Sequence, residues 1–238
     1  MNYALIFAGG TGQRMNSKSK PKQFLDMHGK PILIHTLEVF ENSDCIDAIC
    51  VVCLKGWEET LQRNLQKYNI TKVKFCVQGG ATGHDSIFCG LKALSEVCKA
   101  DDIVLVHDGV RPLINEELLE QNIECVRAHG NAITVETATE SIVQINENEH
   151  IVDVPARDYM RIAKAPQSFY FQEIWELHLK AEKDNFKSID SAHLLNEYGH
   201  GMYMVESTPY NIKIASPSDY YVFRALYEAR ENSQIFGL

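Results

Sequence analysis

The sequence predicts an α/β fold in which a Rossmann-like, mostly parallel β-sheet carries helices on both faces. Short runs that are almost entirely apolar recur along the first half of the chain, and a segment with apolar residues at helical spacing follows each of them. A strand covered on both faces is apolar throughout, whereas a strand with one wet face alternates. Because parallel strands need long crossover connections, the intervening helices complete the prediction.

Strands and helices are expected to alternate over roughly the first half of the chain. The expected strands are Tyr3–Phe7, Ile46–Leu54, Val73–Val77 and Ile103–Val106. The expected helices are Ile32–Phe40, Trp57–Tyr68, Ser86–Val97 and Asn115–Ala128. Asn115 with Glu116 and Glu117 behind it is typical of a helix start, because its side chain can cap free N–H groups and the acids favour the positive end of the helix dipole.

A β-hairpin is predicted where the pattern changes after Gly130. Ala132–Val135 is expected to be a further strand, followed by alternating residues up to Ile145, a polar turn at Asn146–Glu149 and the apolar pair Ile151–Val152. Alternation on both sides of a tight polar turn indicates two paired strands. The hairpin is either an inserted arm or a simple meander at the sheet edge, and the pattern favours neither.

The C-terminal part is expected to complete the same unit, so that residues 1–238 form a single domain. A connection through Ala165–Phe169 leads into it. The expected elements are helices Glu173–Glu182 and Asp190–Tyr198, strands Met202–Val205 and Ile212–Ala215, and a last helix that begins at Ser216. Asp190 is a suitable helix cap, Gly199 a suitable stop and Pro217 a suitable first residue.

Composition excludes several classes of protein. The formal net charge of −9 argues against a general nucleic-acid surface. No run approaches the ~20 apolar residues of a membrane helix, and no secretion signal precedes the first apolar run. We therefore expect a cytoplasmic protein that binds neither nucleic acid nor membrane.

The seven cysteines are expected to be buried free thiols. Their number is odd, and most of them sit in apolar strand or helix patterns. Cys50 and Cys53 form a C-x-x-C pair, but residues three apart on a strand point to opposite faces. A metal or redox role for this pair is therefore not expected.

A polyphosphate-binding loop is predicted in Ala8–Gln23, directly after the first apolar run. Its glycines, Gly9, Gly10 and Gly12, let the backbone approach a ligand without side chains in the way. Four cations follow within nine residues, namely Arg14, Lys18, Lys20 and Lys22. The alternative is an ordinary tight turn followed by a solvated basic loop, which the joint spacing of glycines and cations disfavours.

Two better-known phosphate-binding patterns do not fit this loop. A Walker A loop needs GxxxxGK[ST], and neither Gly9 nor Gly10 begins such a spacing. A dinucleotide fingerprint needs GxGxxG, but Met15 stands where its last glycine belongs. The remaining pattern, GGxGxRM followed by PKQ, resembles that of the nucleotidyltransferases that activate sugars and polyols.

Three polar segments are expected to converge on one cleft. They are the glycine loop after the first strand, Gln78–Gly80 after the third and His107–Pro112 after the fourth. In a mostly parallel sheet, ligands bind beyond the carboxyl ends of the strands. The carboxylate of Asp108 lies at such an end and is a hard oxygen ligand suited to sharing Mg²⁺ with phosphates. The alternative is a carboxylate that caps the nearby turn.

Over essentially its full length, the chain resembles the 2-C-methyl-D-erythritol 4-phosphate cytidylyltransferase family and its close relatives that act on ribitol 5-phosphate. The motifs that carry this resemblance are AGGTGQRM at Ala8–Met15, PKQFL at Pro21–Leu25, Gly79–Gly80 with Ser86, VHDGVRP at Val106–Pro112, PARDYM and APQSF within Pro155–Phe169, and NIKIASPSD at Asn211–Asp219. The residues PARDYM, PQSF and PKQFL are closer to the ribitol 5-phosphate branch.

This resemblance implies a GT-A-like nucleotidyltransferase fold, CTP and a polyol phosphate as substrates, and Mg²⁺ as cofactor. The catalytic cations would be Arg14, Lys22 and Lys213. The nucleotide would be bound by Ala8, Gly9, Gly10, Thr11, Gly12, Gly79, Gly80 and Ser86. The acceptor would be bound by Asp108, Arg111, Ser141 and Arg157, with Asp108 also at the metal.

The family resemblance also implies a homodimer. Residues 139–160 would be a dimerisation arm that lends Arg157 to the partner's acceptor phosphate. The expected reaction transfers CMP from CTP to D-ribitol 5-phosphate, and methylerythritol phosphate is the alternative acceptor. Two departures bear on the acceptor, since His84 follows Gly83 where the family has an arginine, and Ala165 replaces a threonine. A catalytically silent nucleotide-sensing domain is the alternative of another class.

Overall fold

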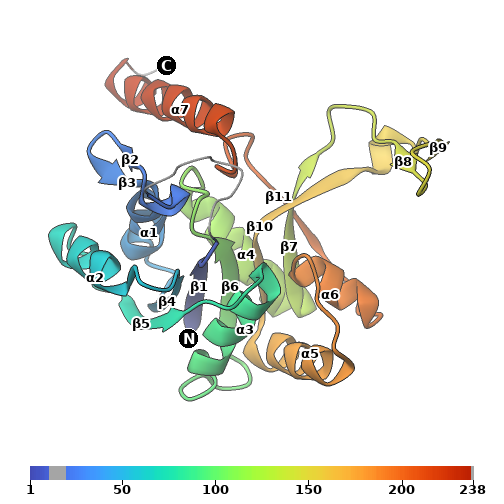
Figure 1. Ribbon diagram of the computed structural model, residues 1–238, viewed down its shortest axis with the longest axis horizontal. Helices are drawn as coiled ribbons and strands as arrows, with labels where there is room; N and C mark the ends of the chain where they lie inside the picture. The colour runs from blue at the N-terminus through green and yellow to red at the C-terminus, as the bar shows by residue number, and fades with distance from the viewer. Residues whose placement is uncertain (11–19, 237–238) are drawn as a thin grey trace.

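Seven strands form one continuous sheet at the centre of the computed structural model, which describes residues 1–10 and 20–236 (Figure 1). Their order across the sheet is β11-β7-β10-β6-β1-β4-β5. The strands are β1 (Asn2–Ala8), β4 (Ala48–Cys53), β5 (Val73–Gln78), β6 (Ile103–Asp108), β7 (Asn131–Thr137), β10 (Arg161–Tyr170) and β11 (Met204–Glu206).

The sheet is parallel around β1 and mixed toward β11. β1 pairs in parallel with both β4 and β6, and β4 pairs in parallel with β5. β10 runs antiparallel to β6 and β7, while β11 is parallel to β7. Phe7 lies opposite both Val52 and Asp108, so the central strands end at the same edge of the sheet. The predicted α/β fold with a mostly parallel sheet is confirmed.

Helices cover both faces of this sheet (Figure 1). They are α1 (Ile32–Asn42), α2 (Glu58–Lys67), α3 (Gly83–Leu94), α4 (Glu116–His129), α5 (Phe171–Asp184), α6 (Ser191–Glu197) and α7 (Pro217–Phe236). α1, α2 and α4 share one apolar cluster with the sheet, whereas α3, α5 and α6 share the other. Within the described residues, no helix is long and apolar enough to cross a membrane.

Residues of the central strands alternate between these two apolar clusters. Ile6 of β1 belongs to the cluster beneath α1, and Leu5 belongs to the one beneath α3. Cys53 and Cys50 divide in the same way, so the C-x-x-C pair points to opposite faces, as predicted. All seven cysteines are free, although only these two are fully buried.

Two predicted helix starts are confirmed by their capping hydrogen bonds. The side chain of Asn115 accepts a hydrogen bond of 3.3 Å from the backbone N–H of Leu118. Oδ1 of Asp190 accepts one of 2.8 Å from the backbone N–H of His193. Each bond satisfies an N–H group that has no partner within the helix itself.

The segment Ala165–Phe169 leads into the next helix as expected, but it does so as part of β10, a strand that was not predicted. The pairing of β10 with β7 is interrupted between Ala163 and Gln167. Pro166 falls in that interruption, and a proline cannot donate to a strand ladder. The sequence therefore hides a strand that runs through the middle of the sheet.

The expected strand at Ile212–Ala215 is wrong, because this segment follows an irregular path. The backbone N–H of Ile214 donates a hydrogen bond of 3.0 Å to the carbonyl of Val110. The side chain of Ile214 is buried in a third apolar cluster with Phe223 of α7. Tertiary packing, rather than a sheet, accounts for the apolar residues here.

A hairpin projects from the body of the protein between β7 and β10 (Figure 1). β8 (Gln144–Ile145) and β9 (Ile151–Asp153) pair with each other in a two-stranded sheet that is separate from the main one. A short 3₁₀ helix, η3 (Arg157–Tyr159), leads back to β10. The exposed apolar side chains of this hairpin are Ile142, Val143, Ile145, Ile151, Val152 and Val154.

Gly90 lets α3 lie directly on the sheet. A Cβ at this position would come within 2.9 Å of side-chain atoms of both Leu5 and Val52. We expect Gly90→Ala to lower the free energy of unfolding by about 1–2 kcal/mol, because overpacking outweighs the gain in helix propensity. The midpoint of urea unfolding measures this change.

Gly83→Ala is the matched control in the first turn of the same helix. An added Cβ there meets nothing within 4 Å. We expect this substitution to be neutral or slightly stabilising, since it only restricts the unfolded chain. Equal effects of the two substitutions would show that α3 is not held as tightly as its contacts indicate.

Candidate active site

Two of the predicted glycine segments meet at the carboxyl edge of the sheet. A Cβ on Gly9 would lie 3.4 Å from Cα of Gly79 and 3.1 Å from Oγ of Ser86. A Cβ on Gly79 would in turn lie 3.0 Å from the same hydroxyl. The structure therefore brings these three predicted nucleotide-binding residues together, whereas Thr11, Gly12 and Arg14 lie outside the described residues.

The N-terminus of α3 joins this meeting point. Thr82 caps the helix, and its side chain and that of Asp85 form a reciprocal capping box. Gly80 lies so close to this turn that a Cβ on it would come within 2.3 Å of Cβ of Asp85. The capping box thus satisfies backbone N–H groups at this end of α3, and the carboxylate of Asp85 meets the partial positive charge of the helix.

Gln23 connects the start of the glycine loop to the short 3₁₀ helix η2 (Lys22–Phe24). Its Nε2 donates hydrogen bonds to the carbonyls of Ala8 at 2.6 Å and Gly10 at 3.2 Å. The side chain is only 1% exposed, so these bonds are shielded from water. Gln23 belongs to the PKQ motif, but no role for it was predicted from the sequence.

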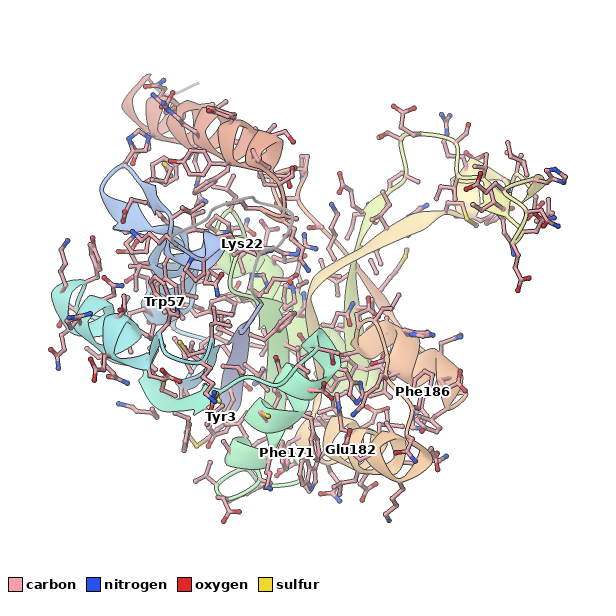
Figure 2. All side chains as sticks on the ribbon, viewed as in Figure 1. Tyr3, Lys22, Trp57, Phe171, Glu182 and Phe186 are labelled. Carbon is pink, nitrogen blue, oxygen red and sulfur yellow. The ribbon has the colours of Figure 1, made fainter. Side chains whose placement is uncertain are left out.

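Lys22 lies near the segment that carries Lys213. In Figure 2 it lies between α7 and the central strands of the sheet. Burial alone would raise the pKa of Asp219, but hydrogen bonds from Ala215 and Ser216 and the nearby charge of Lys22 lower it instead. Because Asp219 binds the backbone two and three residues after Lys213, both predicted catalytic lysines belong to this region.

Asp108 is the centre of an ion-pair cluster in which Asp108 and Arg111 are buried and Lys213 is exposed. Its Oδ1 lies 2.6 Å from Nζ of Lys213, and its Oδ2 accepts a hydrogen bond of 2.7 Å from Nε of Arg111. Burial would raise the pKa of this carboxyl, but the two cations hold its pKa well below the ordinary range. The cluster of one anion and two cations therefore carries a net positive charge.

Asn211 joins the same cluster to the neighbouring strand. Its backbone carbonyl accepts a hydrogen bond of 3.1 Å from Nη1 of Arg111. Its side-chain amide donates to the carbonyl of Ala165 at 2.7 Å and to Oγ of Ser207 at 2.9 Å. The residue is 1% exposed and acts as a structural link that the sequence analysis did not identify.

A cavity of about 200 Å³ opens beside this cluster. Asp108, Arg111 and Lys213 line it together with residues of β10 and of the start of α6. An anionic molecule placed there would meet the net positive charge of the cluster. Two segments far apart in the sequence, Asp108–Arg111 and the one that carries Lys213, thus meet at a cavity whose charge suits an anion.

The donor set of the cavity is suited to a hard cation only if a ligand supplies further oxygens. Among the residues described, no group of three or more His, Cys, Asp or Glu side chains is arranged to hold a metal ion. Asp108 is ionised, and each carboxylate oxygen has more than one lone pair. Mg²⁺ commonly takes one or two carboxylates and completes its shell with phosphate and water, so Asp108 fits this ion as a single protein ligand.

Ser141 and Arg157 are not part of this cluster within one chain. Both are exposed on the hairpin, which projects from the body of the protein (Figure 1). Nη1 of Arg157 donates a hydrogen bond of 3.3 Å to the carbonyl of Thr139. These two predicted acceptor-binding residues therefore lie apart from Asp108 in a single subunit.

Both residues that depart from the family pattern, His84 and Ala165, are buried. His84 is buried, and its Nδ1 lies 2.8 Å from Oγ of Ser188 in the connection between α5 and α6. Burial lowers the pKa of this imidazole, which packs against the ring of His178. Ala165 is also buried, and its carbonyl accepts the bond from Asn211.

The charge on Asp108 is expected to make stability depend on pH. At neutral pH, Asp108→Asn should lower the free energy of unfolding by roughly 3 kcal/mol, because Arg111 and Lys213 lose their counter-ion. The folded pKa lies below the unfolded value of about 4, so the stabilisation is present above about pH 4 and is lost as the pH falls further. Urea unfolding of the wild type and of Asp108→Asn, from about pH 7 to about pH 3, measures the difference between their free energies of unfolding.

Asp101→Asn is the control, because this carboxylate is exposed. Its effect on the free energy of unfolding should stay within about 0.5 kcal/mol across the same range. If the gap between wild type and Asp108→Asn did not narrow below about pH 4, the charge of Asp108 would not be the stabilising feature.

The sequence matches one family of enzymes over nearly its full length. The family model described as 2-C-methyl-D-erythritol 4-phosphate cytidylyltransferase matches residues 3–228. A ribitol-5-phosphate cytidylyltransferase of Streptococcus agalactiae serotype Ia is 48% identical over 239 residues, which covers 100% of both chains. A 2-C-methyl-D-erythritol 4-phosphate cytidylyltransferase of Clostridium botulinum is 38% identical over 218 residues, covering 92% of this chain and 93% of that relative.

The fold also matches solved structures of this family. The crystal structure of a 4-diphosphocytidyl-2C-methyl-D-erythritol synthase from Anaerococcus prevotii matches with a TM-score of 0.82 and 28% identity, over 95% of this chain and 96% of that one. The resemblance inferred from the motifs is thus confirmed over nearly the whole chain. The chain belongs to the 2-C-methyl-D-erythritol 4-phosphate cytidylyltransferase family of enzymes.

Proposed function

We propose that this enzyme transfers CMP from CTP to D-ribitol 5-phosphate, giving CDP-ribitol and pyrophosphate. The observation that carries the proposal is the 48% identity over the full length to a ribitol-5-phosphate cytidylyltransferase. Identity to the methylerythritol phosphate enzyme of Clostridium botulinum is lower, at 38%. The family model bears the methylerythritol name, so 2-C-methyl-D-erythritol 4-phosphate is kept as the second candidate acceptor.

The chemistry asks for positioning and charge. An oxygen of the acceptor phosphate attacks the α-phosphorus of CTP, and the bond from that phosphorus to the oxygen of the β-phosphate breaks. Because the acceptor phosphate is already an anion near neutral pH, no general base is needed to activate it. The barrier is the repulsion between two highly charged anions, which fixed cations can offset.

The surroundings of the two predicted lysines support this role. Lys213 is 40% exposed beside the cavity, and Asp108 holds its Nζ in place. Lys22 is the first residue of η2, directly after Pro21, and it lies near the segment that carries Lys213. We assign both lysines and Arg14 to the triphosphate and the developing charge at the α-phosphorus, where preorganised cations act most strongly.

The nucleotide would lie over the glycine corner of the site. Gly9, Gly79 and Ser86 pack closely against one another there, with little room for a Cβ on either glycine. We propose that Gly80 and Ser86 hold the cytosine ring there.

Mg²⁺ is proposed as the cofactor, with Asp108 as its protein ligand and the triphosphate supplying most other oxygens. When bound, this ion would neutralise phosphate charge during the transfer. Asp108 keeps the carboxylate form that such a ligand needs, because its pKa is held low by Lys213 and Arg111.

A homodimer is also part of the proposal. The projecting hairpin exposes six apolar side chains between Ile142 and Val154, an arrangement that favours burial against another subunit. We propose that residues 139–160 are the dimerisation arm and that Arg157 and Ser141 complete the acceptor site of the partner. We also propose a cytoplasmic location.

The acceptor is tested by pyrophosphate release from CTP and Mg²⁺ with ribitol, methylerythritol and glycerol phosphates. We expect ribitol 5-phosphate to give the highest kcat/KM, and removal of Mg²⁺ by EDTA to stop the reaction. Preference for methylerythritol phosphate would transfer the assignment to the second candidate. An absence of turnover with every acceptor would support the nucleotide-sensing alternative.

The roles of the two lysines are tested by alanine substitution. Lys22→Ala and Lys213→Ala should each lower kcat by about 100-fold or more, since each cation acts mainly on the transition state. Lys183, an exposed residue of α5, provides the control, and Lys183→Ala should keep the wild-type rate. A rate near that of wild type in either site variant would contradict the role assigned to that lysine.

The exchange of arms is tested by mixing two inactive variants. Arg157→Ala and Lys22→Ala subunits, produced together with different tags, should form mixed dimers in which one of the two sites is complete. Random assembly would restore roughly a quarter of the wild-type rate. If the mixture stays as inactive as either parent, Arg157 does not act on the partner's site.

A further inference from the structure

Lys164 is a second lysine beside the cavity, in addition to Lys213. It belongs to β10 and lines the cavity with Asp108 and Lys213. Its side chain is 16% exposed, and its Nζ lies 2.5 Å from Oε2 of Glu136 on the neighbouring strand β7. The ion pair fixes the ammonium group at one wall of the cavity.

The cavity has one part that suits an anionic group and another that suits neutral hydroxyl groups. The cluster of Asp108 with Arg111 and Lys213 has one cation in excess and suits an anionic group. The pair of Lys164 and Glu136 is neutral overall, so it adds little attraction for a phosphate. Its ammonium still has hydrogen atoms left to donate, and a polyol offers neutral hydroxyl oxygens as acceptors.

Ser191 supplies a second polar group at the same cavity. It is 2% exposed, and within the part of the chain that the structure describes its Oγ has no hydrogen-bond partner. A buried hydroxyl without a partner is costly, and a bound molecule commonly satisfies such a group. Rotation about its single side-chain torsion would redirect this hydroxyl.

The neighbouring polar side chains are already engaged. Nε2 of Gln167 donates to Oδ2 of Asp190 at 3.2 Å, and its Oε1 accepts from the backbone N–H of Ala192 at 2.9 Å. Asp190 also caps α6 through His193. These residues hold the wall in place, which leaves Lys164 and Ser191 to meet a ligand.

We propose that Lys164 and Ser191 select the acceptor by hydrogen bonding to hydroxyl groups of its polyol chain, while the Asp108 cluster meets its charged part. This inference rests on the proposed function, because it takes a polyol phosphate as the molecule in the cavity. The neutral end of the acceptor is thereby recognised by donors from β10 and α6 of the same subunit.

A cycle between enzyme and substrate variants tests the inference with D-ribitol 5-phosphate and its monodeoxy analogues. Lys164→Met should lower kcat/KM for the parent acceptor about 10- to 100-fold, by raising the acceptor KM and leaving the KM for CTP unchanged. One monodeoxy analogue should lose a similar factor with the wild-type enzyme. That analogue should lose little more with Lys164→Met, because the same hydrogen bond is already missing.

Ser191→Ala should show the same relation with a different monodeoxy analogue and a smaller loss, about 3- to 10-fold. Lys164→Met combined with Glu136→Gln removes the ion pair as a unit, and we expect it to match the single variant, since no carboxylate is left unpaired. Lys183→Met, an exposed change on α5, should leave both KM values unchanged.

Equal losses for all acceptors, including every monodeoxy analogue, would overturn the inference, as would an equal rise in the KM for CTP. Failure of the wild-type enzyme with ribitol 5-phosphate would count against the proposed function alone. The inference is then tested on the polyol phosphate that the wild type does use, and it falls with the proposed function if the wild type uses none.

Discussion

The ion pairs of one buried carboxylate determine how the rest of the site is built. Asp108 ends β6 and would be costly to bury alone, but Lys213 and Arg111 compensate its charge. Both cations come from segments outside the regular sheet. The need to neutralise Asp108 therefore holds the irregular segment around Lys213 against the strand end, and Asn211 ties it further to β10.

Close backbone approach forms the second half of the site. Gly9 and Gly79 leave no room for side chains, and Gly90 lets α3 rest on the sheet, so the helix N-terminus reaches the same edge. The nucleotide corner thus depends on the absence of side chains, whereas the acceptor corner depends on buried charge. Gln23 holds the described part of the glycine loop beside η2.

Much of this arrangement could be predicted from sequence, and the failures have physical causes. The strand-helix alternation gave the parallel half of the sheet, because strands covered on both faces are apolar throughout. β10 was missed because Pro166 interrupts its pattern, and Ile212–Ala215 was misassigned because burial in a tertiary cluster resembles strand patterning. Asp108 and Lys213 could be named from motifs, but the positions of Lys164 and Ser191 depend on long-range packing that no local pattern records.

A crystal structure with CTP, Mg²⁺ and the acceptor would test most directly whether fixed cations bring two anions together. We expect Nζ of both Lys22 and Lys213 within hydrogen-bond distance of CTP phosphate oxygens, with the acceptor phosphate facing the α-phosphorus beside Asp108. A complex in which the triphosphate lies away from Lys213, with the cavity beside Asp108 empty, would contradict this explanation of catalysis.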